Sequence, residues 1–308
     1  MISPMPSTKF LKTCIVIAGP TAVGKTSMAI ALAQYFNTCI VSADSRQCFK
    51  EMNIGVAKPT AQQLQQVKHY FINSHSITDD VNAGLFEQYA LDAVHAIFQE
   101  HDIAVMVGGT GLYIRAFCEG MDAIPAASAA LRDAITSSYK QGGLAWLQNE
   151  IKEKDPAWFA SGEIQNPQRI MRALEVVLHS GRSILSFQQP VKAVRNFNII
   201  KIGLAIPRVE LYQHINTRVD EMISEGLEQE VVSLLPYRNL NALQTVGYRE
   251  MFEYLEGSVD IGTAVENIKK NTRHYAKRQL TWFTKDAAMQ WYTPLDYSQL
   301  IVYLQKLV

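Results

Sequence analysis

One short unit near the N-terminus constrains the fold more than any other part of the sequence. Residues 13–18 (TCIVIA) form an apolar, β-branched run that is typical of a buried strand. GPTAVGKT follows at once over 19–26 and fits the phosphate-loop pattern GxxxxGK[ST]. KTSMAIALAQYF (25–36) then carries apolar residues at helical spacing. A strand, a glycine-rich loop and a helix in this order predict the first unit of an α/β fold.

Strand-like and helix-like signals keep alternating through the first third of the chain. Apolar runs that predict strands lie at 38–43, 69–73 and 103–107, and 83–100 has the pattern of an amphipathic helix. This alternation predicts a parallel sheet with crossover helices, and such sheets bind ligands at the carboxyl ends of their strands. Three candidate site segments directly follow predicted strands: 19–26, 44–47 and 108–111.

Further along the chain the pattern changes. Strand signals vanish, and helical stretches occupy 128–141, 143–153 and 168–180. A β-run at 197–206 predicts a return to the sheet, and 288–293 predicts a late strand. We therefore expect an α/β, P-loop NTPase-like core with a parallel sheet and flanking helices over 1–120 and 197–308, and a helical insertion over 121–196.

Composition limits the partners and the compartment. Acidic and basic residues balance at 29 each, so no global field points to a nucleic acid or a membrane, although a local basic patch is compatible with this balance. The four cysteines, Cys14, Cys39, Cys48 and Cys118, show no CxxC spacing, which favours buried thiols in a reducing compartment over disulfides or zinc. No apolar run approaches the roughly 18 residues that a spanning helix needs. We expect a cytoplasmic protein with no membrane partner.

The phosphate loop supplies several groups that suit an anion. Its glycines let backbone N–H groups point into a cavity at a helix N-terminus, Lys25 supplies positive charge, and Thr26 can ligate Mg²⁺. The bare pattern also occurs by chance in glycine-rich turns. The strand before it and the helix after it favour phosphate binding.

A carboxylate that ATP-hydrolysing P-loop enzymes usually carry is missing. In such enzymes an Asp at the end of a later apolar strand helps to hold Mg²⁺. Here the run 103–107 is followed by Gly-Gly-Thr-Gly, and the nearest candidate carboxylate is Asp44. A lone Asp after a strand is by default a helix cap or turn residue. Beside a phosphate loop, Asp44 can also act as a general base or help to hold the metal.

A basic, aromatic helix is predicted near the C-terminus. Residues 266–285 contain six Lys or Arg against one acid, and Lys270, Arg273 and Lys277 share one helical face. Nucleic-acid backbones attract such a face, but a solvated face of a packed helix is an equally ordinary interpretation. Arg169 and Arg172 lie on one side of a helix in the insertion, which alone is weak evidence for RNA binding. Composition and spacing do not name a substrate.

Six sequence blocks, taken in order, resemble the tRNA dimethylallyltransferase (tRNA isopentenyltransferase) family. They are GPTAVGKT (19–26), ADSRQCFKEMNIGVAKP (43–59), GGTGLY (108–113), NPQRIMRALE (166–175), VGYRE (246–250) and YAKRQLTWF (275–283). The resemblance runs through nearly the whole chain, and the order of the blocks makes it far more specific than the loop alone. Val23 and Val56 stand where Ser and Thr are common, and Cys48-Phe49 where Val-Tyr is common. Because Val56 lacks a hydroxyl, we expect no polar role for it.

The resemblance implies an enzyme that transfers a dimethylallyl group from dimethylallyl diphosphate to tRNA. The acceptor would be the exocyclic amino group of the adenosine 3′-adjacent to the anticodon, and diphosphate would be released. The phosphate loop would then hold a leaving group, with Mg²⁺, which fits the missing acid. The target adenine must be turned out of the stacked loop. The resemblance also implies a monomer whose insertion, 121–196, binds the tRNA anticodon stem-loop.

Site residues carry over by resemblance to matching positions. Asp44 would be the general base, Thr110 would orient the nucleophile, and Arg218 would stabilise the departing diphosphate. The diphosphate-binding residues would be Gly19, Pro20, Thr21, Ala22, Val23, Gly24, Lys25 and Thr26, with Thr26 also the metal ligand. The tRNA-binding residues would be Asp44, Ser45, Arg46, Gln47, Thr110, Gln168, Arg169, Ile170, Met171 and Arg172. The basic helix at 269–278 would meet tRNA backbone or the diphosphate.

Two other classes of function stay open. In a P-loop small-molecule kinase, Asp44 would activate a substrate hydroxyl, ATP would be consumed and tRNA would be irrelevant. In an RNA-binding protein with a vestigial phosphate loop, tRNA binding would survive Lys25→Ala and there would be no chemistry.

Overall fold

The computed structural model describes residues 12–188 and 192–308. The chain divides into two compact units. Unit 1 comprises Met1–Glu119 and Val194–Val308, and unit 2 comprises Gly120–Ala193. These divisions lie close to the boundaries that the change in sequence pattern predicts.

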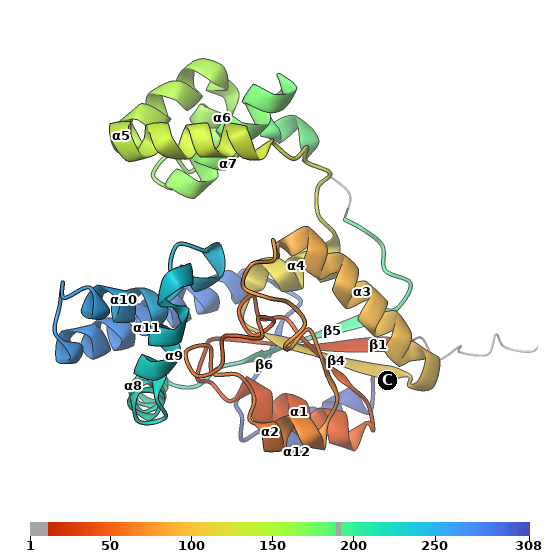
Figure 1. Cartoon of the computed structure of the whole chain (residues 1–308). Coiled ribbons are helices and arrows are strands. Elements are labelled where there is room, and N and C mark those ends of the chain that lie inside the picture. Colours follow the sequence, from red (N-terminus) through yellow and green to blue (C-terminus); the bar gives the residue numbers. More distant parts are fainter. Residues whose placement is uncertain (1–11, 189–191) are drawn as a thin grey trace, which may run out of the picture. The chain divides into compact units, whose positions relative to one another are not determined.

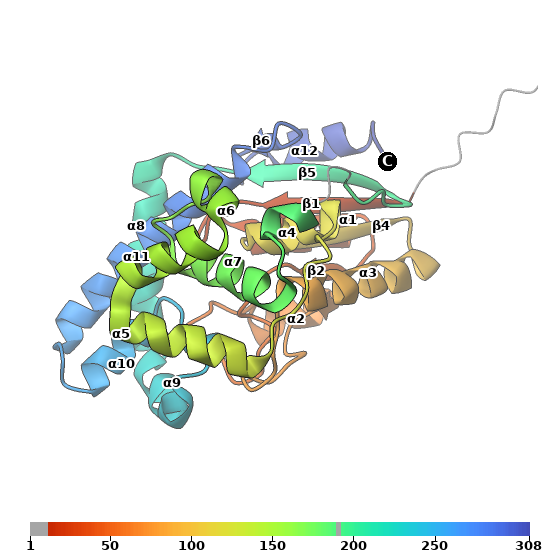
Figure 2. The same cartoon turned by 90° about the horizontal axis from the view of Figure 1, so that it is seen from above.

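Unit 1 is built on a parallel sheet. Among the described residues the sheet has six strands in the order β3-β2-β4-β1-β5-β6, and every pairing is parallel. The strands are β1 (Thr13–Ala18), β2 (Ile40–Ser42), β3 (His69–Tyr70), β4 (Ile103–Gly108), β5 (Asn198–Leu204) and β6 (Gln290–Tyr292). Figure 2 shows β5, β1 and β4 side by side in this order. Each strand overlaps a segment of the sequence that predicts it, and the P-loop NTPase-like α/β fold is confirmed.

Helices make up most of the rest of unit 1. They are α1 (Lys25–Tyr35), α2 (Ala61–Gln66), α3 (Ala83–Glu100), α4 (Gly111–Glu119), α8 (Arg208–Ser224), α9 (Leu227–Leu234), α10 (Tyr248–Leu255), α11 (Ile261–Phe283) and α12 (Tyr297–Leu304), with short 3₁₀ turns η2 (Leu235–Tyr237) and η3 (Asn241–Leu243). Helices α8 to α11 pack on one another beside the sheet (Figure 1). This group supplies a second set of side chains to the carboxyl edge of the sheet.

The two faces of the sheet carry separate cores. Ile15 and Ile17 of β1 pack with α1 and α12, whereas Cys14 and Val16 pack with α3 and α4. Figure 1 shows α1 and α12 on one face of the sheet and α3 and α4 on the other. Because β1 is covered on both faces, all its residues are buried. This explains why its sequence is a continuous apolar run rather than an alternating one.

Unit 2 is helical throughout its described residues. It contains α5 (Ala129–Lys154), α6 (Pro156–Ser161), α7 (Pro167–Ser180) and the 3₁₀ turn η1 (Ile184–Phe187). Helix α5 contains the two helical stretches predicted at 128–141 and 143–153, and the predicted break between them is confirmed at Gly143, whose backbone is non-helical with a φ of 64°. The side chains of Asp155 and Asn166 cap α6 and α7, each followed by proline at the first helical position. The unit has its own core, formed by Ile135, Leu147, Ile151, Trp158, Ile170, Met171, Ala173 and Leu174.

Two further expectations concern the membrane and the cysteines. In the part of the chain that the structure describes, every helix is too short or too polar to cross a bilayer. The four cysteines, all within that part, are free thiols, and three of them are buried. Burial raises the pKa of Cys48 to about 12. The thiol near Asp44 therefore stays protonated and is a poor nucleophile.

Candidate active site

The phosphate loop packs tightly against the sheet. It connects β1 to α1, and Gly19 has a φ of 150°, which favours glycine. A Cβ on Gly19 would lie 2.6 Å from the carbonyl oxygen of Leu204 in β5, so only glycine lets the loop pass this strand. Gly24, with a φ of 95°, precedes α1 and provides no side-chain cap. The first N–H groups of α1 are therefore open to a ligand.

Lys25 places a titratable cation at this helix N-terminus. Its Nζ donates a hydrogen bond to the carbonyl oxygen of Pro20 at 2.6 Å. Burial lowers the pKa of Lys25 to about 7, while Asp44 acts to raise it and Arg218 to lower it further. An anion bound beside Nζ would favour the charged form. The backbone N–H groups of the loop and the side chain of Lys25 are therefore both suited to binding phosphate groups.

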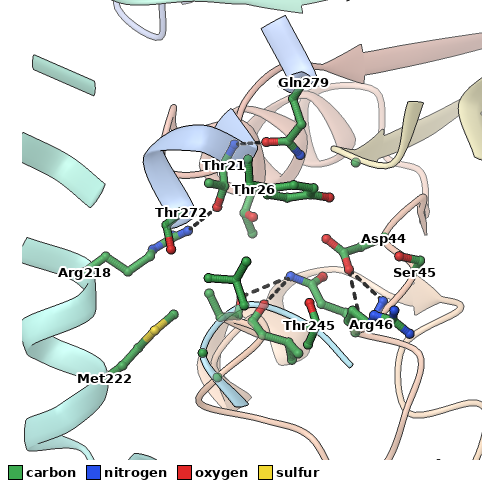
Figure 3. A pocket seen from close by; sticks show the side chains of 18 of the residues that line it. Thr21, Thr26, Asp44, Ser45, Arg46, Arg218, Met222, Thr245, Thr272 and Gln279 are labelled. Carbon is green, nitrogen blue, oxygen red and sulfur yellow. Dashed lines mark hydrogen bonds between the residues drawn. The ribbon is translucent and has the colours of Figure 1, made fainter. Parts of the chain in front are cut away.

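Asp44 follows β2 and uses one carboxylate oxygen to shape its own loop. Its Oδ1 accepts hydrogen bonds from the backbone N–H groups of Arg46 at 2.9 Å and Gln47 at 3.3 Å. Oδ2 has neither of these bonds. Figure 3 shows Asp44 on one side of the pocket and Arg218 on the other, with Thr26 between them in this view. The carboxylate therefore lies in the same pocket as the phosphate loop.

The Gly-Gly-Thr-Gly turn after β4 supports the loop that carries Asp44. A Cβ on Gly108 would lie 2.1 Å from the carbonyl oxygen of Ala43, so glycine is needed where β2 and β4 end together. Thr110 Oγ1 accepts a hydrogen bond from the backbone N–H of Ser45 at 3.1 Å. The Thr110 side chain also lies near Tyr275 of α11 and acts to lower the pKa of that hydroxyl, which burial raises to about 12. Three strand ends therefore meet at one edge of the sheet, as the alternation of strands and helices predicts.

Gln279 of α11 links the phosphate loop to the turn after β4. Its Oε1 accepts from the backbone N–H of Thr21 at 2.8 Å, and its Nε2 donates to the carbonyl oxygen of Gly109 at 2.9 Å. The side chain is buried, with both ends of its amide satisfied. Sequence reasoning assigned no role to this residue, although it lies within the YAKRQLTWF block. The basic segment of α11 therefore also has a structural task inside the core.

Arg218 completes the cationic end of the pocket from α8. Its Nη1 lies 3.5 Å from Thr21 Oγ1, within reach of the phosphate loop. Thr272 of α11 lines the pocket close to it (Figure 3). Lys25, Thr26 and Arg218 thus converge from two helices that are far apart in sequence.

The pocket has a volume of about 380 Å³ and two kinds of lining. Among the described residues that line it, Asp44 is the single acid, against five basic ones: Lys25, Arg46, Arg218, Arg249 and Arg278. Apolar lining comes mainly from Val56, Ala57, Val219, Met222, Val246 and Ile268. Such a cavity suits a ligand that joins an anionic group to an apolar one.

The sequence-predicted site residues fall into two groups. Thr21, Lys25, Thr26, Asp44 and Arg218 line one pocket together with Ser45, Arg46 and Gln47, and Thr110 is one hydrogen bond away. The rest of the phosphate loop, Gly19, Pro20, Ala22, Val23 and Gly24, forms its backbone.

The predicted tRNA-binding residues of α7 lie in unit 2. Gln168 and Arg169 are exposed, whereas Ile170 and Met171 are buried in the core of that unit. Arg172 is paired with Glu175 at 3.2 Å and contacts the carbonyl oxygen of Pro125 at 3.4 Å. Direct contact with a large ligand is thus open to Gln168 and Arg169, while the buried pair serves to hold α7 in place.

A parallel sheet with a glycine-rich loop of the phosphate-loop pattern at its carboxyl edge, next to a carboxylate and an apolar wall, places the chain in the class of P-loop NTPase-like α/β folds. Comparison with known proteins names the family. A family model described as IPP transferase matches residues 47–286. A tRNA dimethylallyltransferase of Cytophaga hutchinsonii is 46% identical over 294 residues, covering 96% of this chain and 97% of the relative. The chain belongs to this family, the IPP transferases or tRNA dimethylallyltransferases.

Solved structures agree with this assignment. The full-length tRNA isopentenylpyrophosphate transferase of Bacillus halodurans matches with a TM-score of 0.70 and 32% identity, covering 96% of this chain and 95% of that chain. A eukaryotic dimethylallyltransferase, described as acting on tRNA, matches with a TM-score of 0.74 and 25% identity, covering 92% of this chain and 75% of that chain. The fold therefore extends over both units of the present chain.

Proposed function

We propose that the protein transfers a dimethylallyl group from dimethylallyl diphosphate to the exocyclic amino group of the adenosine 3′-adjacent to the anticodon in tRNA, releasing diphosphate. One observation carries the proposal: a single pocket combines a cationic phosphate loop, a carboxylate and an apolar wall. Membership of the IPP transferase family supports the same reaction.

The diphosphate of the donor would lie at the phosphate loop. N–H groups at the start of α1, together with Lys25 and Arg218, would stabilise the negative charge that grows as the C–O bond breaks. This use of the loop needs no carboxylate after β4, because no triphosphate is hydrolysed. The diphosphate would leave with both of its phosphates intact.

Mg²⁺ fits this end of the pocket. Within the described residues there is no cluster of three or more His, Cys, Asp or Glu side chains that could cage a metal. Mg²⁺ commonly takes only one or two protein oxygens together with substrate phosphates and water. The Thr26 hydroxyl lines the pocket and is an oxygen donor of this kind. We propose that Thr26 holds the ion, which when bound would add positive charge to the departing diphosphate.

Asp44 would accept the proton that the adenine amino group loses as its nitrogen attacks the prenyl carbon. One oxygen of Asp44 is fixed by two backbone N–H groups, which orients the other oxygen. Thr110, whose Oγ1 accepts from the backbone N–H of Ser45, would orient the same amino group. The prenyl chain would pack against the apolar lining near Val56, where a methyl group stands in place of a hydroxyl.

The RNA would approach over the arginines that do not serve the diphosphate. Arg46, Arg249 and Arg278 come from three separate segments and line the same pocket. Guanidinium groups bind phosphates bidentately and stack on bases, which suits a nucleotide turned out of the anticodon loop. Ser45 and Gln47 would border the flipped base.

Unit 2 would grip the anticodon stem-loop through the exposed face of α7, with Gln168 and Arg169 in contact. We also propose, on the family resemblance alone, that the enzyme works as a cytoplasmic monomer. No observation favours the kinase or the vestigial RNA-binding protein. Neither of these two functions explains why part of the pocket is lined by apolar side chains.

A direct assay tests the proposal. Purified protein and Mg²⁺ are incubated with dimethylallyl diphosphate and unmodified tRNA that has adenine 3′ of the anticodon, and the digested nucleosides are analysed by mass spectrometry. We expect dimethylallyl-adenosine at that one position. Consumption of ATP without any prenylated nucleoside would contradict the transferase and support the kinase.

A further inference from the structure

Glu230 of α9 accepts four hydrogen bonds, three of them from the backbone of residues 53–55, the segment that leads into the pocket wall at Gly55. Its Oε2 accepts from the backbone N–H groups of Asn53 at 3.0 Å and Ile54 at 2.8 Å. Its Oε1 accepts from the N–H of Gly55 at 3.0 Å and from the hydroxyl of Tyr248 at 2.6 Å. We call this arrangement of one carboxylate, three consecutive N–H groups and one tyrosine hydroxyl the Glu230 clasp. Four donors fill the acceptor positions of an ionised carboxylate.

The Glu230 clasp depends on acceptors alone. An amide or a protonated acid at this position would turn a donor toward groups that are themselves donors. Tyr248 is fully buried, and burial together with the charge of Glu230 raises its pKa, so its hydroxyl remains a donor. A Cβ on Gly55 would lie 2.6 Å from the Tyr248 ring, so only glycine permits this approach. Helices α9 and α10 are thus both fitted to one stretch of backbone.

The segment that the clasp holds continues into the pocket wall. Gly55, Val56 and Ala57 all line the pocket. Gln47 Nε2 donates to the carbonyl oxygens of Val56 at 3.3 Å and Ala57 at 3.1 Å. The backbone N–H of Gln47 in turn donates to Asp44 Oδ1. A continuous path of hydrogen bonds therefore joins the clasp to the loop of the general base.

We propose that Glu230 is a positioning residue for the transfer reaction, which fixes residues 55–57 as the wall against which the prenyl chain packs. This inference rests on the proposed function above. The clasp bonds to residues 53–55 and Tyr248, whereas Lys25 and Arg218 bond to Pro20 and Thr21 of the phosphate loop. Loss of the clasp should therefore weaken binding of the whole prenyl donor more than binding of inorganic diphosphate.

The test uses Glu230→Gln in the full-length protein. Glutamine has one acceptor oxygen, and its NH₂ group faces backbone N–H groups, so the wall segment must shift. We expect the KM for dimethylallyl diphosphate to rise about tenfold, the effect of losing one hydrogen bond to a charged group, while kcat falls less than about threefold. The Kd for inorganic diphosphate, measured by calorimetry with Mg²⁺, should stay within about twofold of the wild-type value.

Glu228→Gln is the matched control. Glu228 lies on the same helix and its Oε1 also accepts from a tyrosine hydroxyl of α10, that of Tyr254 at 3.3 Å. None of its recorded bonds, among the residues described, reaches the segment held by Glu230. Its KM and kcat should match those of the wild type.

Three results would overturn the inference. One is an unchanged KM in folded Glu230→Gln, and another is a parallel loss of inorganic diphosphate binding, which would indicate general damage. If Glu230→Gln fails to fold, Tyr248→Phe is used instead, because it removes only the hydrogen bond from the Tyr248 hydroxyl and should raise KM about threefold. An unchanged KM in Tyr248→Phe would be the third contradicting result. Absence of prenyl transfer by the wild type would instead contradict the proposed function, and with it any role of Glu230 in that reaction.

Discussion

Among single residues, Asp44 shapes its own loop through Oδ1 and is proposed to act as the general base. Asparagine keeps the Oδ1 that accepts from Arg46 and Gln47, so Asp44→Asn removes the charge and leaves the loop intact. We expect kcat for prenyl transfer to fall by about 10²–10⁴, the usual contribution of a general base. The affinity for tRNA, measured by filter binding, should stay within several-fold. A large loss of tRNA binding would make Asp44 a structural residue instead.

The lowered pKa of Lys25 predicts that the affinity for diphosphate depends on pH. Its pKa of about 7 means that the ammonium is charged below pH 7 in the free protein and neutral above it. Because the charged form attracts an anion, the affinity for inorganic diphosphate should be highest below pH 7. Above it, affinity should fall by up to about tenfold per pH unit, until the pH reaches the raised pKa of Lys25 in the complex. Calorimetric titrations across this range measure the effect.

Lys25→Met is the control for this pH dependence. Diphosphate changes its own protonation with pH, and the variant keeps that effect while removing the lysine. The ratio of wild-type to variant affinity should therefore fall as the pH rises through 7. A ratio that is constant across the range would contradict the assigned pKa.

Local sequence was enough to place some site residues but not others. Lys25, Thr26 and Asp44 could be placed because each lies in a segment that directly follows a predicted strand, at the edge where ligands bind. Gln279 could not, because its partner Thr21 lies 258 positions away and no local pattern encodes that contact. The same holds for Glu230, whose bonds to 53–55 depend on how α9 packs. Side chains that act through tertiary contacts leave no periodic signal.

A substitution on the exposed face of helix α7 is expected to weaken tRNA binding without unfolding the protein. Arg169 is exposed, and among the described residues its ion pair is with the exposed Glu163, at 2.5 Å, so Arg169→Ala removes little stability. We expect weaker tRNA binding and a salt dependence that is flatter by about one unit of slope. Binding assays over a range of salt concentrations measure both.

Lys154→Ala is the matched control for Arg169→Ala. Lys154 is also an exposed cation of unit 2 with a single carboxylate partner, Glu153 at 2.6 Å, but it lies at the end of α5. Its removal should leave the salt slope unchanged. An unchanged slope in Arg169→Ala would exclude Arg169 from the interface.

Elements with strong periodicity could be predicted from the sequence, whereas the ends of the weaker elements could not. The pattern at 83–100 matches α3 residue for residue, because an apolar face and an Asn82 cap define it. At the edge of the sheet, β3 has two residues where the apolar run 69–73 is longer, since pairing with β2 ends there. In unit 2, the break predicted at Gly142 and Gly143 is confirmed, because the backbone of Gly143 is non-helical between two helical stretches of α5.

For the chain as a whole, the two units have separate hydrophobic cores. Unit 1 contains every residue of the pocket, and unit 2 has a separate core around Trp158 and Ile170. The loss of strand signals after the Gly-Gly-Thr-Gly turn was enough to predict this division. Composition and spacing did not identify the substrate. A phosphate-loop pattern by itself is compatible both with a triphosphate that is hydrolysed and with a diphosphate that is a leaving group.

The phosphate loop as holder of a leaving group can be tested by stoichiometry. Transfer of one dimethylallyl group breaks one C–O bond, forms one C–N bond and releases one diphosphate and one proton. With tRNA, dimethylallyl diphosphate and Mg²⁺, we predict one inorganic diphosphate per prenylated adenosine, at a rate that added ATP does not raise. Release of orthophosphate from ATP, with no diphosphate matched to a prenylated adenosine, would contradict the account.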